Sequence, residues 1–268
     1  MKVLVTGGTG VLGREVVGRL RERDHDVRVL THRSASTPDA VQGDLDTPGD
    51  PGLRRAVTGV DTIVHCATAG DVRRPWRDLA QTRNLLDAAS DQRPHIVYIS
   101  IVGVDRIRFG YYRAKWGCER MIAASGLPWT TQRVTQFHDF ILVAATALTK
   151  LPVALVPRRL PFQPVDVGEV ADRLASLASE DPARRVPDFG GPEVRFLDDL
   201  VHTYLQFSGR HRPVLSTPVP GRAAAGFRAG HHLLGVGARR GHRTFEDYLR
   251  ARLSTAGTLT PPYAHAGR

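Results

Sequence analysis

The chain has 268 residues, 41% of them hydrophobic, so it is long enough to bury the core of one large α/β domain with a smaller cap. This composition excludes fibrous and disordered proteins. The formal net charge of +10 invites comparison with nucleic-acid-binding proteins, but the arginines are scattered singly and in pairs, without a basic helix or an aromatic-interleaved stripe. We therefore expect no nucleic-acid partner.

The apolar residues never form a run of about 18, which a transmembrane helix would need, so we expect no membrane span. Met1 and Lys2 lead directly into the first predicted strand, and we expect no signal peptide. The sequence therefore predicts a cytoplasmic location. The expected partner is a small-molecule substrate. The sequence does not define the oligomeric state, and a homodimer is one possibility.

The first predicted strand, residues 2–6, runs straight into a glycine-rich turn and a helix over about residues 10–23. In such a tight turn Gly7 and Gly10 must lack side chains so that a pyrophosphate can reach backbone N–H groups, and Gly13 lets the helix lie close on the sheet. The glycine spacing alone would also fit a structural turn, but the strand before it and the helix after it favour a dinucleotide site. The expected cofactor-binding residues of this segment are Gly7, Thr9, Gly10, Val11 and Leu12.

Strands and helices continue to alternate through the first half of the chain, which predicts a parallel, doubly wound sheet. The expected strands cover residues 26–31, 40–43, 62–67, 95–100 and 129–133, and the expected helices cover about residues 52–57, 76–90 and 111–125. We assign residues 1–135 to a dinucleotide-binding domain and residues 136–268 to a smaller cap. Residues 164–180 of the cap are expected to pack back on the first domain.

The end of the second strand indicates which dinucleotide is bound. A protein that reads NAD usually places an acidic residue there, but this chain has His32 and Arg33, which could meet a 2′-phosphate. NADP(H) is therefore favoured over NAD(H), although Arg33 could also be one of many exposed arginines.

Residues at the ends of the third and fourth strands are expected to line the cofactor cleft. Asp44 and Leu45 follow the third strand, where a side chain can reach the adenine, and Ala67 and Thr68 end the fourth strand. Asp44 could equally cap a turn.

The helix after the fifth strand carries Tyr111 and Lys115, which are four residues apart and therefore lie on one helix face. A neighbouring ammonium favours the phenolate form of a tyrosine, so that the phenol can exchange a proton with a substrate carbonyl. The spacing would be unlikely by chance, because only Lys2, Lys115 and Lys150 are lysine among the 37 basic residues. The alternative is a packing aromatic with a snorkelling lysine.

Beyond residue 136 prolines are frequent and the predicted elements are shorter. Residues 165–171 indicate a short strand followed by a helix, and residues 244–253 indicate a last amphipathic helix. The apolar residues of this region suggest a hydrophobic substrate, although they could equally form core; they are Leu151, Val153, Leu155, Val156 and Phe162.

Several segments together resemble the atypical short-chain dehydrogenase/reductases of the NmrA-like, NAD(P)-binding kind, over residues 1 to about 253. The glycine motif and the Tyr/Lys pair are the specific parts of this resemblance. The segments are Thr6-Gly7-x-x-Gly10-x-x-Gly13, Asn84 within residues 82–89, Tyr111-x-x-x-Lys115-x-x-x-Glu119, residues 126–130 and residues 164–167.

The resemblance implies a Rossmann-type doubly wound parallel sheet with a small C-terminal substrate cap. It further implies that Lys115 binds the nicotinamide ribose and that Tyr111 is the acid/base. A serine usually completes this set, and Ser100 is the candidate, although it lies earlier than the family's catalytic serine and could instead help to bind the cofactor. After the sixth strand, Gln136, Phe137 and His138 are expected to bind substrate.

The first functional hypothesis is an NAD(P)H-dependent oxidoreductase, with NADPH favoured, that reduces a carbonyl or a conjugated double bond of a small, hydrophobic molecule. Hydride would come from the nicotinamide and a proton from Tyr111. A second hypothesis is a redox sensor that binds the dinucleotide without turnover, as some NmrA-like proteins do. A third is an isomerase, epimerase or dehydratase that uses NAD(P) internally.

Overall fold

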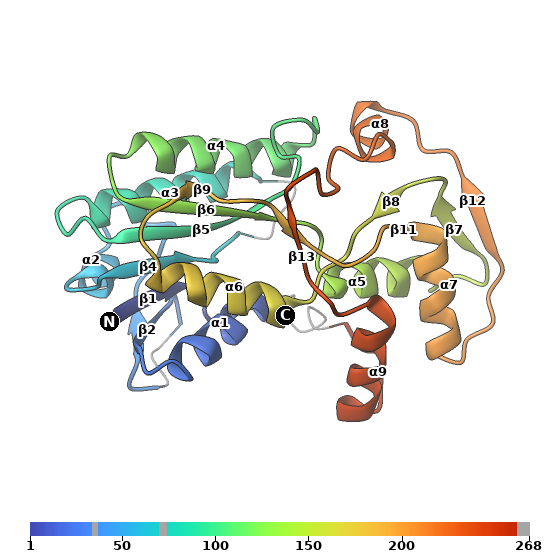
Figure 1. Cartoon of the computed structure of the whole chain (residues 1–268), viewed down its shortest axis with the longest axis horizontal. Coiled ribbons are helices and arrows are strands. Elements are labelled where there is room, and N and C mark those ends of the chain that lie inside the picture. The colour runs from blue at the N-terminus through green and yellow to red at the C-terminus, as the bar shows by residue number, and fades with distance from the viewer. Residues whose placement is uncertain (34–36, 70–73, 262–268) are drawn as a thin grey trace. The chain divides into compact units, whose positions relative to one another are not determined.

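The computed structural model describes residues 1–33, 37–69 and 74–261, and these form two compact units. Unit 1 contains the sheet with helices on both faces, and unit 2 is built from shorter elements (Figure 1). Unit 1 comprises residues 1–105, 109–133 and 168–187, and unit 2 comprises residues 106–108, 134–167 and those from 188 onward.

The strands of unit 1 pair in parallel in the order β6-β5-β4-β1-β2-β3, and β9 also pairs with β6. The order reverses beside β1, which is the arrangement of a doubly wound Rossmann-type sheet. The predicted fold is therefore confirmed. The bounds of these strands are β1 Lys2–Thr6, β2 Asp26–Thr31, β3 Ala40–Gln42, β4 Thr62–His65, β5 His95–Ile101, β6 Trp129–Val134 and β9 Arg184–Arg185.

Helices cover both faces of this sheet, α2, α3 and α4 on one face and α1 and α6 on the other (Figure 1). Their bounds are α1 Val11–Arg21, α2 Pro51–Val57, α3 Trp76–Ala89, α4 Gly110–Ala124 and α6 Val167–Ser179. Because both faces are covered, the central strands are apolar without alternation: Val3, Leu4 and Val5 are all fully buried. The helices α3 and α4 pack against one another along the same face.

Unit 2 has a core of its own, in which Ile141, Leu200 and Phe245 are buried. Its strands are short: β7 pairs in parallel with β12, β8 pairs antiparallel with β11, and β10 pairs with Val134 and with β13. The bounds are α5 His138–Leu148, β7 Ala154–Pro157, β8 Pro161–Phe162, β10 Phe189–Gly190, β11 Arg195–Phe196, α7 Leu197–Phe207, β12 Val214–Thr217, α8 Arg222–Arg228, β13 Arg239–Arg240 and α9 Phe245–Ala256.

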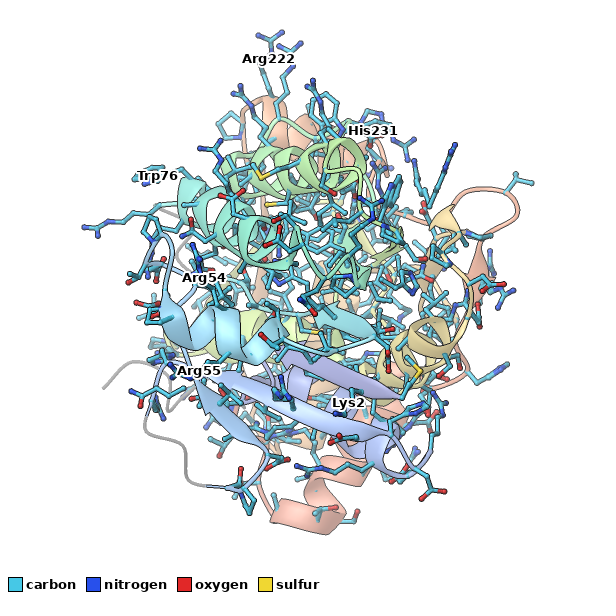
Figure 2. All side chains as sticks on the ribbon, turned by 90° about the vertical axis from the view of Figure 1, so that its left-hand side faces the viewer. Lys2, Arg54, Arg55, Trp76, Arg222 and His231 are labelled. Atoms are coloured by element: carbon cyan, nitrogen blue, oxygen red, sulfur yellow. The ribbon has the colours of Figure 1, made fainter. Side chains whose placement is uncertain are left out.

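Arginine side chains line the surface, as Arg54 and Arg55 of α2 and Arg222 of α8 illustrate (Figure 2). Unit 2 carries about twice as many Lys and Arg as Asp and Glu, whereas unit 1 is nearly balanced. Within residues 1–33, 37–69 and 74–261, the helices are all too short or too polar to cross a membrane.

Candidate functional site

The turn between β1 and α1 is so tight that it requires glycine. Gly7 has φ of +70°, and a Cβ there would lie 2.7 Å from the backbone nitrogen of Ala67. A Cβ on Gly13 would lie 2.1 Å from the carbonyl oxygen of Gly7. Neither contact is compatible with a side chain, because the obstacle is backbone in each case. The chain therefore passes close to the residues that follow β4, and we call this turn, residues 7–13, the glycine cradle.

The N-terminus of α1 supplies the donors that a pyrophosphate needs. Thr9 and Gly10 are exposed, and α1 has no acidic residue in its first turn. The first N–H groups of a helix have no partner within the helix and carry positive partial charge. The Arg14 guanidinium donates to the carbonyl of Thr9 at 2.9 Å, so a cation also lies at this turn. Arg14 was not among the predicted site residues, although its position in the first turn of the helix could have suggested it.

The side chain of Arg33, which follows β2, is exposed to solvent. The backbone N–H of Arg33 donates to the Thr31 hydroxyl at 3.1 Å, which turns the chain directly after the strand. The Arg33 side chain is exposed and has no ion-pair partner among the described residues. His32 is also exposed.

The carboxylate of Asp44 closes the turn after β3. It accepts from the Asp46 N–H at 2.9 Å and from the Thr47 hydroxyl at 3.0 Å. Leu45 is buried, and its carbonyl accepts from the Asn84 side chain at 2.8 Å. The turn-capping alternative therefore has direct support, and the expected contact of Asp44 with adenine stays a prediction.

Tyr111 and Lys115 lie one turn apart on α4, as their spacing predicts, with the Lys115 Nζ 5.8 Å from the centre of the Tyr111 ring. The Tyr111 hydroxyl is 3.3 Å from the hydroxyl of Thr68, which follows β4. The Lys115 side chain is only 5% exposed, and Nζ lies 3.3 Å from Oδ2 of Asp78 on α3. The structure thus brings Thr68, Tyr111 and Lys115 together and adds Asp78, which the sequence did not single out.

The surroundings of Lys115 keep it charged. Burial disfavours the ammonium, but the negative charges that Tyr111 and Asp78 can carry outweigh burial and raise the pKa of Lys115 above its ordinary value. The Nζ also lies 5.4 Å from the centre of the Tyr98 ring. Burial and the Lys115 charge together lower the pKa of the neighbouring His65 to about 3, so His65 is neutral at physiological pH.

Ser100 lies on β5, two residues after Tyr98, so the two side chains point to the same face of the sheet. Because the Tyr98 ring lies beside Lys115, this is the face covered by α4. Ser100 is 1% exposed, and its hydroxyl has no hydrogen-bond partner among the described residues. The catalytic role of Ser100 stays a prediction.

The residues predicted to bind substrate lie in unit 2. Gln136 and Phe137 are half-buried, whereas His138 is fully buried and stacks on Tyr248 with ring centres 5.3 Å apart. The His138 Nε2–H donates to the carbonyl of Arg243 at 3.1 Å, and burial lowers the pKa of His138 to about 4. A substrate contact through His138 would need this packed ring to move, so the expectation stays a prediction.

The apolar residues that suggest a hydrophobic substrate have divided roles in unit 2. Val156 and Phe162 are buried in its core, whereas Leu151 and Leu155 are exposed. The core residues are explained by packing and do not support the suggestion.

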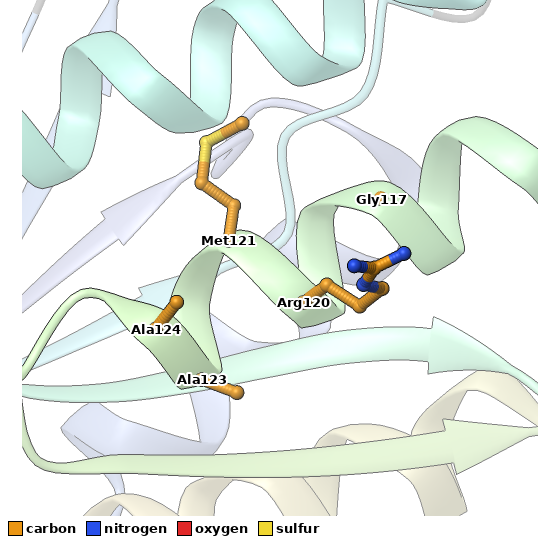
Figure 3. Close-up of a pocket in the computed structure, with 5 residues that line it drawn as sticks. All are labelled: Gly117, Arg120, Met121, Ala123 and Ala124. Carbon is orange, nitrogen blue, oxygen red and sulfur yellow. The ribbon is translucent and has the colours of Figure 1, made fainter.

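A hollow on α4 lies apart from all predicted site residues. All the residues that line it belong to α4: Gly117, Arg120, Met121, Ala123 and Ala124 (Figure 3). Its polar group is the guanidinium of Arg120, which stacks on Trp116 at 5.4 Å. The hollow offers no convergent polar groups, so we do not assign it to the cofactor.

The residues of unit 1 fit a dinucleotide. The glycine cradle has no room for a Cβ at Gly7 or Gly13, and the first turn of α1 contains no acidic residue. An ammonium has three N–H donors, and Asp78 is the hydrogen-bonding partner of Lys115 in the described part of the chain, so two donors remain for ribose hydroxyls. Groups of His, Cys, Asp and Glu that could hold a metal ion are absent from the described residues.

Comparisons with known proteins agree with this geometry. Residues 7–151, more than half of the chain, match the family described as NAD(P)H-binding. An uncharacterized protein of Mycobacterium tuberculosis is 28% identical over 190 residues, which are 69% of this chain and 19% of that protein. The chain thus spans about a fifth of the length of this relative.

Two further proteins carry informative names. The chloroplastic divinyl chlorophyllide a 8-vinyl-reductase of Oryza sativa subsp. indica is 34% identical over 225 residues, covering 71% of this chain and 54% of that protein. The NADPH complex of the NADPH-dependent quinone oxidoreductase QOR2 from Escherichia coli superposes with a TM-score of 0.77 at 18% identity, covering 93% of this chain and 99% of that chain. The structural likeness shows a shared fold, and the family match confirms the NAD(P)-binding part of the resemblance. This chain belongs to the NAD(P)H-binding family.

Proposed function

We propose that this protein is an NADPH-dependent oxidoreductase that reduces a carbonyl or a conjugated double bond of a small organic molecule, with Tyr111 as proton donor. The observation that carries the proposal is the position of the Tyr111 side chain beside the buried Lys115 ammonium on one face of α4, with Nζ 5.8 Å from the centre of the Tyr111 ring. A structural lysine would have all its donors satisfied or in solvent, whereas Lys115 is buried and keeps two donors for a ligand.

The roles of the side chains follow from their positions. Bound NADPH supplies the hydride. Lys115 would hold ribose hydroxyls through its remaining N–H donors, and Tyr111 would give its hydroxyl proton to the substrate oxygen or carbon as negative charge develops there. The half-buried Tyr111 can meet both a buried lysine and an incoming substrate.

The choice of NADPH rests on the end of β2. The exposed Arg33 guanidinium and the neighbouring His32 could contact a 2′-phosphate, and residues 31–33 contain no carboxylate that would accept from a ribose hydroxyl. The name of the Escherichia coli structural neighbour is consistent with this choice.

Nicotinamide absorbance tests the reaction. The purified protein is mixed with NADPH or NADH and screened against quinones, enones and ketones, and we expect NADPH oxidation with at least one of these classes. The Tyr111→Phe variant should lose about 100-fold to 10,000-fold in kcat, because general acid catalysis contributes about that much. Tyr112→Phe is the matched control, since Tyr112 is buried beside Phe109 and lies outside the pair.

An unchanged kcat in Tyr111→Phe would contradict the assigned proton donor. If the wild-type protein bound neither NADPH nor NADH in calorimetry, the proposal of a nucleotide-dependent enzyme would be wrong.

A second candidate, a sensor that binds the dinucleotide without turnover, is favoured by Ser100. The hydroxyl expected to polarise a substrate carbonyl is buried and unpaired among the described residues. Tight NADPH binding with no oxidation by any acceptor, in a protein whose Tyr111→Phe variant binds equally well, would support this candidate instead.

A further inference from the structure

We propose that Thr68 and Asp78 are positioning residues for the Tyr111–Lys115 pair: Asp78 fixes the Lys115 ammonium, and Thr68 couples the same carboxylate to the Tyr111 hydroxyl. The inference rests on the proposed function for its catalytic consequence. Its structural content concerns four described side chains of unit 1 and can be tested without substrate.

Asp78 is the centre of this group. It lies in the first turn of α3 and is only 4% exposed, although it carries a carboxylate. Its Oδ1 accepts from the backbone N–H of Ala69 at 2.7 Å, and its Oδ2 accepts from the Thr68 hydroxyl at 2.8 Å and lies 3.3 Å from the Lys115 Nζ. A buried carboxylate with three donors ties the segment after β4 to both α3 and α4.

Proton counting gives the chain of hydrogen bonds a direction. A hydroxyl has a single proton, and the Thr68 proton goes to Asp78, because a carboxylate can only accept. The Thr68 oxygen must therefore accept in its contact with Tyr111, so the Tyr111 hydroxyl donates to Thr68 across the 3.3 Å between them. The order is Tyr111 to Thr68 to Asp78, with the Lys115 ammonium donating to Asp78 from the other side.

This direction has a consequence for the position of Tyr111. An acceptor for its O–H fixes where the hydroxyl lies, and the O–H turns from Thr68 to the substrate when the proton is given up. The Asp78 carboxylate also balances the Lys115 charge. Thr68 and Asp78 thus hold the Tyr111 hydroxyl and the Lys115 ammonium in position.

Close packing of α3 on α4 makes the arrangement possible. A Cβ on Gly117 would lie 2.6 Å from Cδ2 of Leu79, the residue that follows Asp78 on α3. The absence of a side chain at Gly117, two residues after Lys115, therefore lets α3 approach α4 closely. This approach brings Asp78 to the ammonium.

Lysine resonances provide a readout that does not depend on turnover. The protein has three lysines, so ¹³Cε-lysine labelling gives three signals, and Lys2→Arg and Lys150→Arg assign them. In nucleotide-free protein, Asp78→Asn should shift the Lys115 signal and lower the pH of its titration by at least about one unit. Asp87→Asn is the matched control, because Asp87 is exposed on the same helix and should leave the Lys115 signal unchanged.

Thr68 is tested through the tyrosine. In nucleotide-free protein with ¹³Cζ-tyrosine, Thr68→Val should shift the Tyr111 signal, which Tyr111→Phe identifies, and Thr68→Ser should restore it. With an acceptor substrate, Thr68→Val should lower kcat by about tenfold or more while the Kd for NADPH changes less than about threefold, and Thr68→Ser should recover most of the loss.

The outcomes separate this inference from the proposed function. An unchanged Lys115 signal in folded Asp78→Asn, or an unchanged Tyr111 signal in Thr68→Val, would overturn the positioning roles even in an active enzyme. Shifted signals in a protein that oxidises no NADPH would support the positioning roles while the proposed function fails. If Asp78→Asn does not fold, the Thr68 variants, which keep every charge, still decide whether the coupling to Tyr111 exists.

Discussion

Unit 1 and unit 2 are stabilised in different ways. In unit 1, cations are matched by anions even when buried: Arg133 is 5% exposed and pairs with both Asp105 and Glu119. In unit 2, basic residues outnumber acidic ones about two to one, and exposed apolar side chains such as Leu155 and Leu215 pair across short strands. In unit 1 the regular sheet positions residues of opposite charge so that they form ion pairs. In unit 2 the short elements are held together mainly by the aliphatic and aromatic core.

The difference shows where each unit tolerates change. A long parallel sheet fixes its helices, so the groups of unit 1 that we propose to face the nucleotide depend on close backbone approach at a few glycines. Unit 2 depends more on buried rings and helix ends, among them the buried histidines His138 and His232. Four predictions test this contrast, from the largest expected effect to the smallest.

The largest effect is expected at the glycine cradle. Gly13→Ala places a methyl against the Gly7 carbonyl, and we expect a loss of about 3 kcal/mol or more in the free energy of unfolding and at least hundredfold weaker NADPH binding in calorimetry. Gly18→Ala, on the same helix and with no atom within 4 Å of the new methyl, should keep the affinity and gain about 0.5 to 1 kcal/mol. Equal behaviour of the two variants would show that the cradle is not the nucleotide site.

The second effect is acid sensitivity, which should be greater in unit 2. Burial lowers the pKa to about 4 for both His138 and His232 in unit 2. In unit 1 burial and the Lys115 charge lower the pKa of His65 to about 3, and burial also lowers the pKa of His25 and His95, whose shifts are smaller. The unfolded chain therefore binds these protons first as pH falls below about 6.5, so stability is present above that pH and is lost toward pH 4, at about 1.4 kcal/mol per pH unit for each group.

The chain offers a clean probe for this contrast, because Trp76, Trp116 and Trp129 all lie in unit 1. Urea unfolding followed by tryptophan fluorescence reports unit 1, whereas far-UV circular dichroism reports both units. At pH 5 we expect the circular dichroism midpoint to fall below the fluorescence midpoint. Coincident midpoints at pH 5 would show that the units do not differ in this way.

The third prediction concerns the exposed cation at the end of β2. Arg33→Ala should weaken NADPH binding by about tenfold to hundredfold and leave NADH binding nearly unchanged, because only NADPH carries the 2′-phosphate. Arg55→Ala, which removes another exposed arginine of unit 1, is the control and should affect neither nucleotide (Figure 2). An equal loss for both nucleotides in Arg33→Ala would refute the contact with the 2′-phosphate.

The smallest effect is expected at a helix end of unit 2. Thr244 and Asp247 form a capping box at the start of α9, whereas the N-cap residue of α7, Phe196, makes no side-chain capping hydrogen bond. Thr244→Ala should lower the free energy of unfolding by about 1 kcal/mol in urea, and Thr244→Ser should retain nearly all of the stability. A larger loss in Thr244→Ser than in Thr244→Ala would rule out the cap as the cause.

The regular part of the fold was accessible from sequence because its signals are local. The strand ending at Thr6 and the glycines that follow predicted the turn before α1, and the spacing of Tyr111 and Lys115 predicted their shared face. The strands of two residues in unit 2, such as β8 and β10, are too short to show any alternation and could not be predicted.

The missing parts of the site depend on tertiary contacts. Asp78 lies in a helical pattern that gives no sign of its burial, and its meeting with Lys115 requires α3 and α4 to pack closely. Thr68 was expected beside the cofactor, but its contact with Tyr111 joins residues 43 positions apart. Such contacts become visible only when the sheet sets the two helices side by side.

The scarcity of lysine has a practical consequence for handling the protein. Coupling reagents that acylate amines find Lys2 and Lys150 exposed, whereas Lys115 is shielded by its burial and by its ion pair with Asp78. Attachment through amines to a sensor chip or a bead should therefore leave the ammonium beside Tyr111 unmodified, and the immobilised protein should keep its capacity for nucleotide.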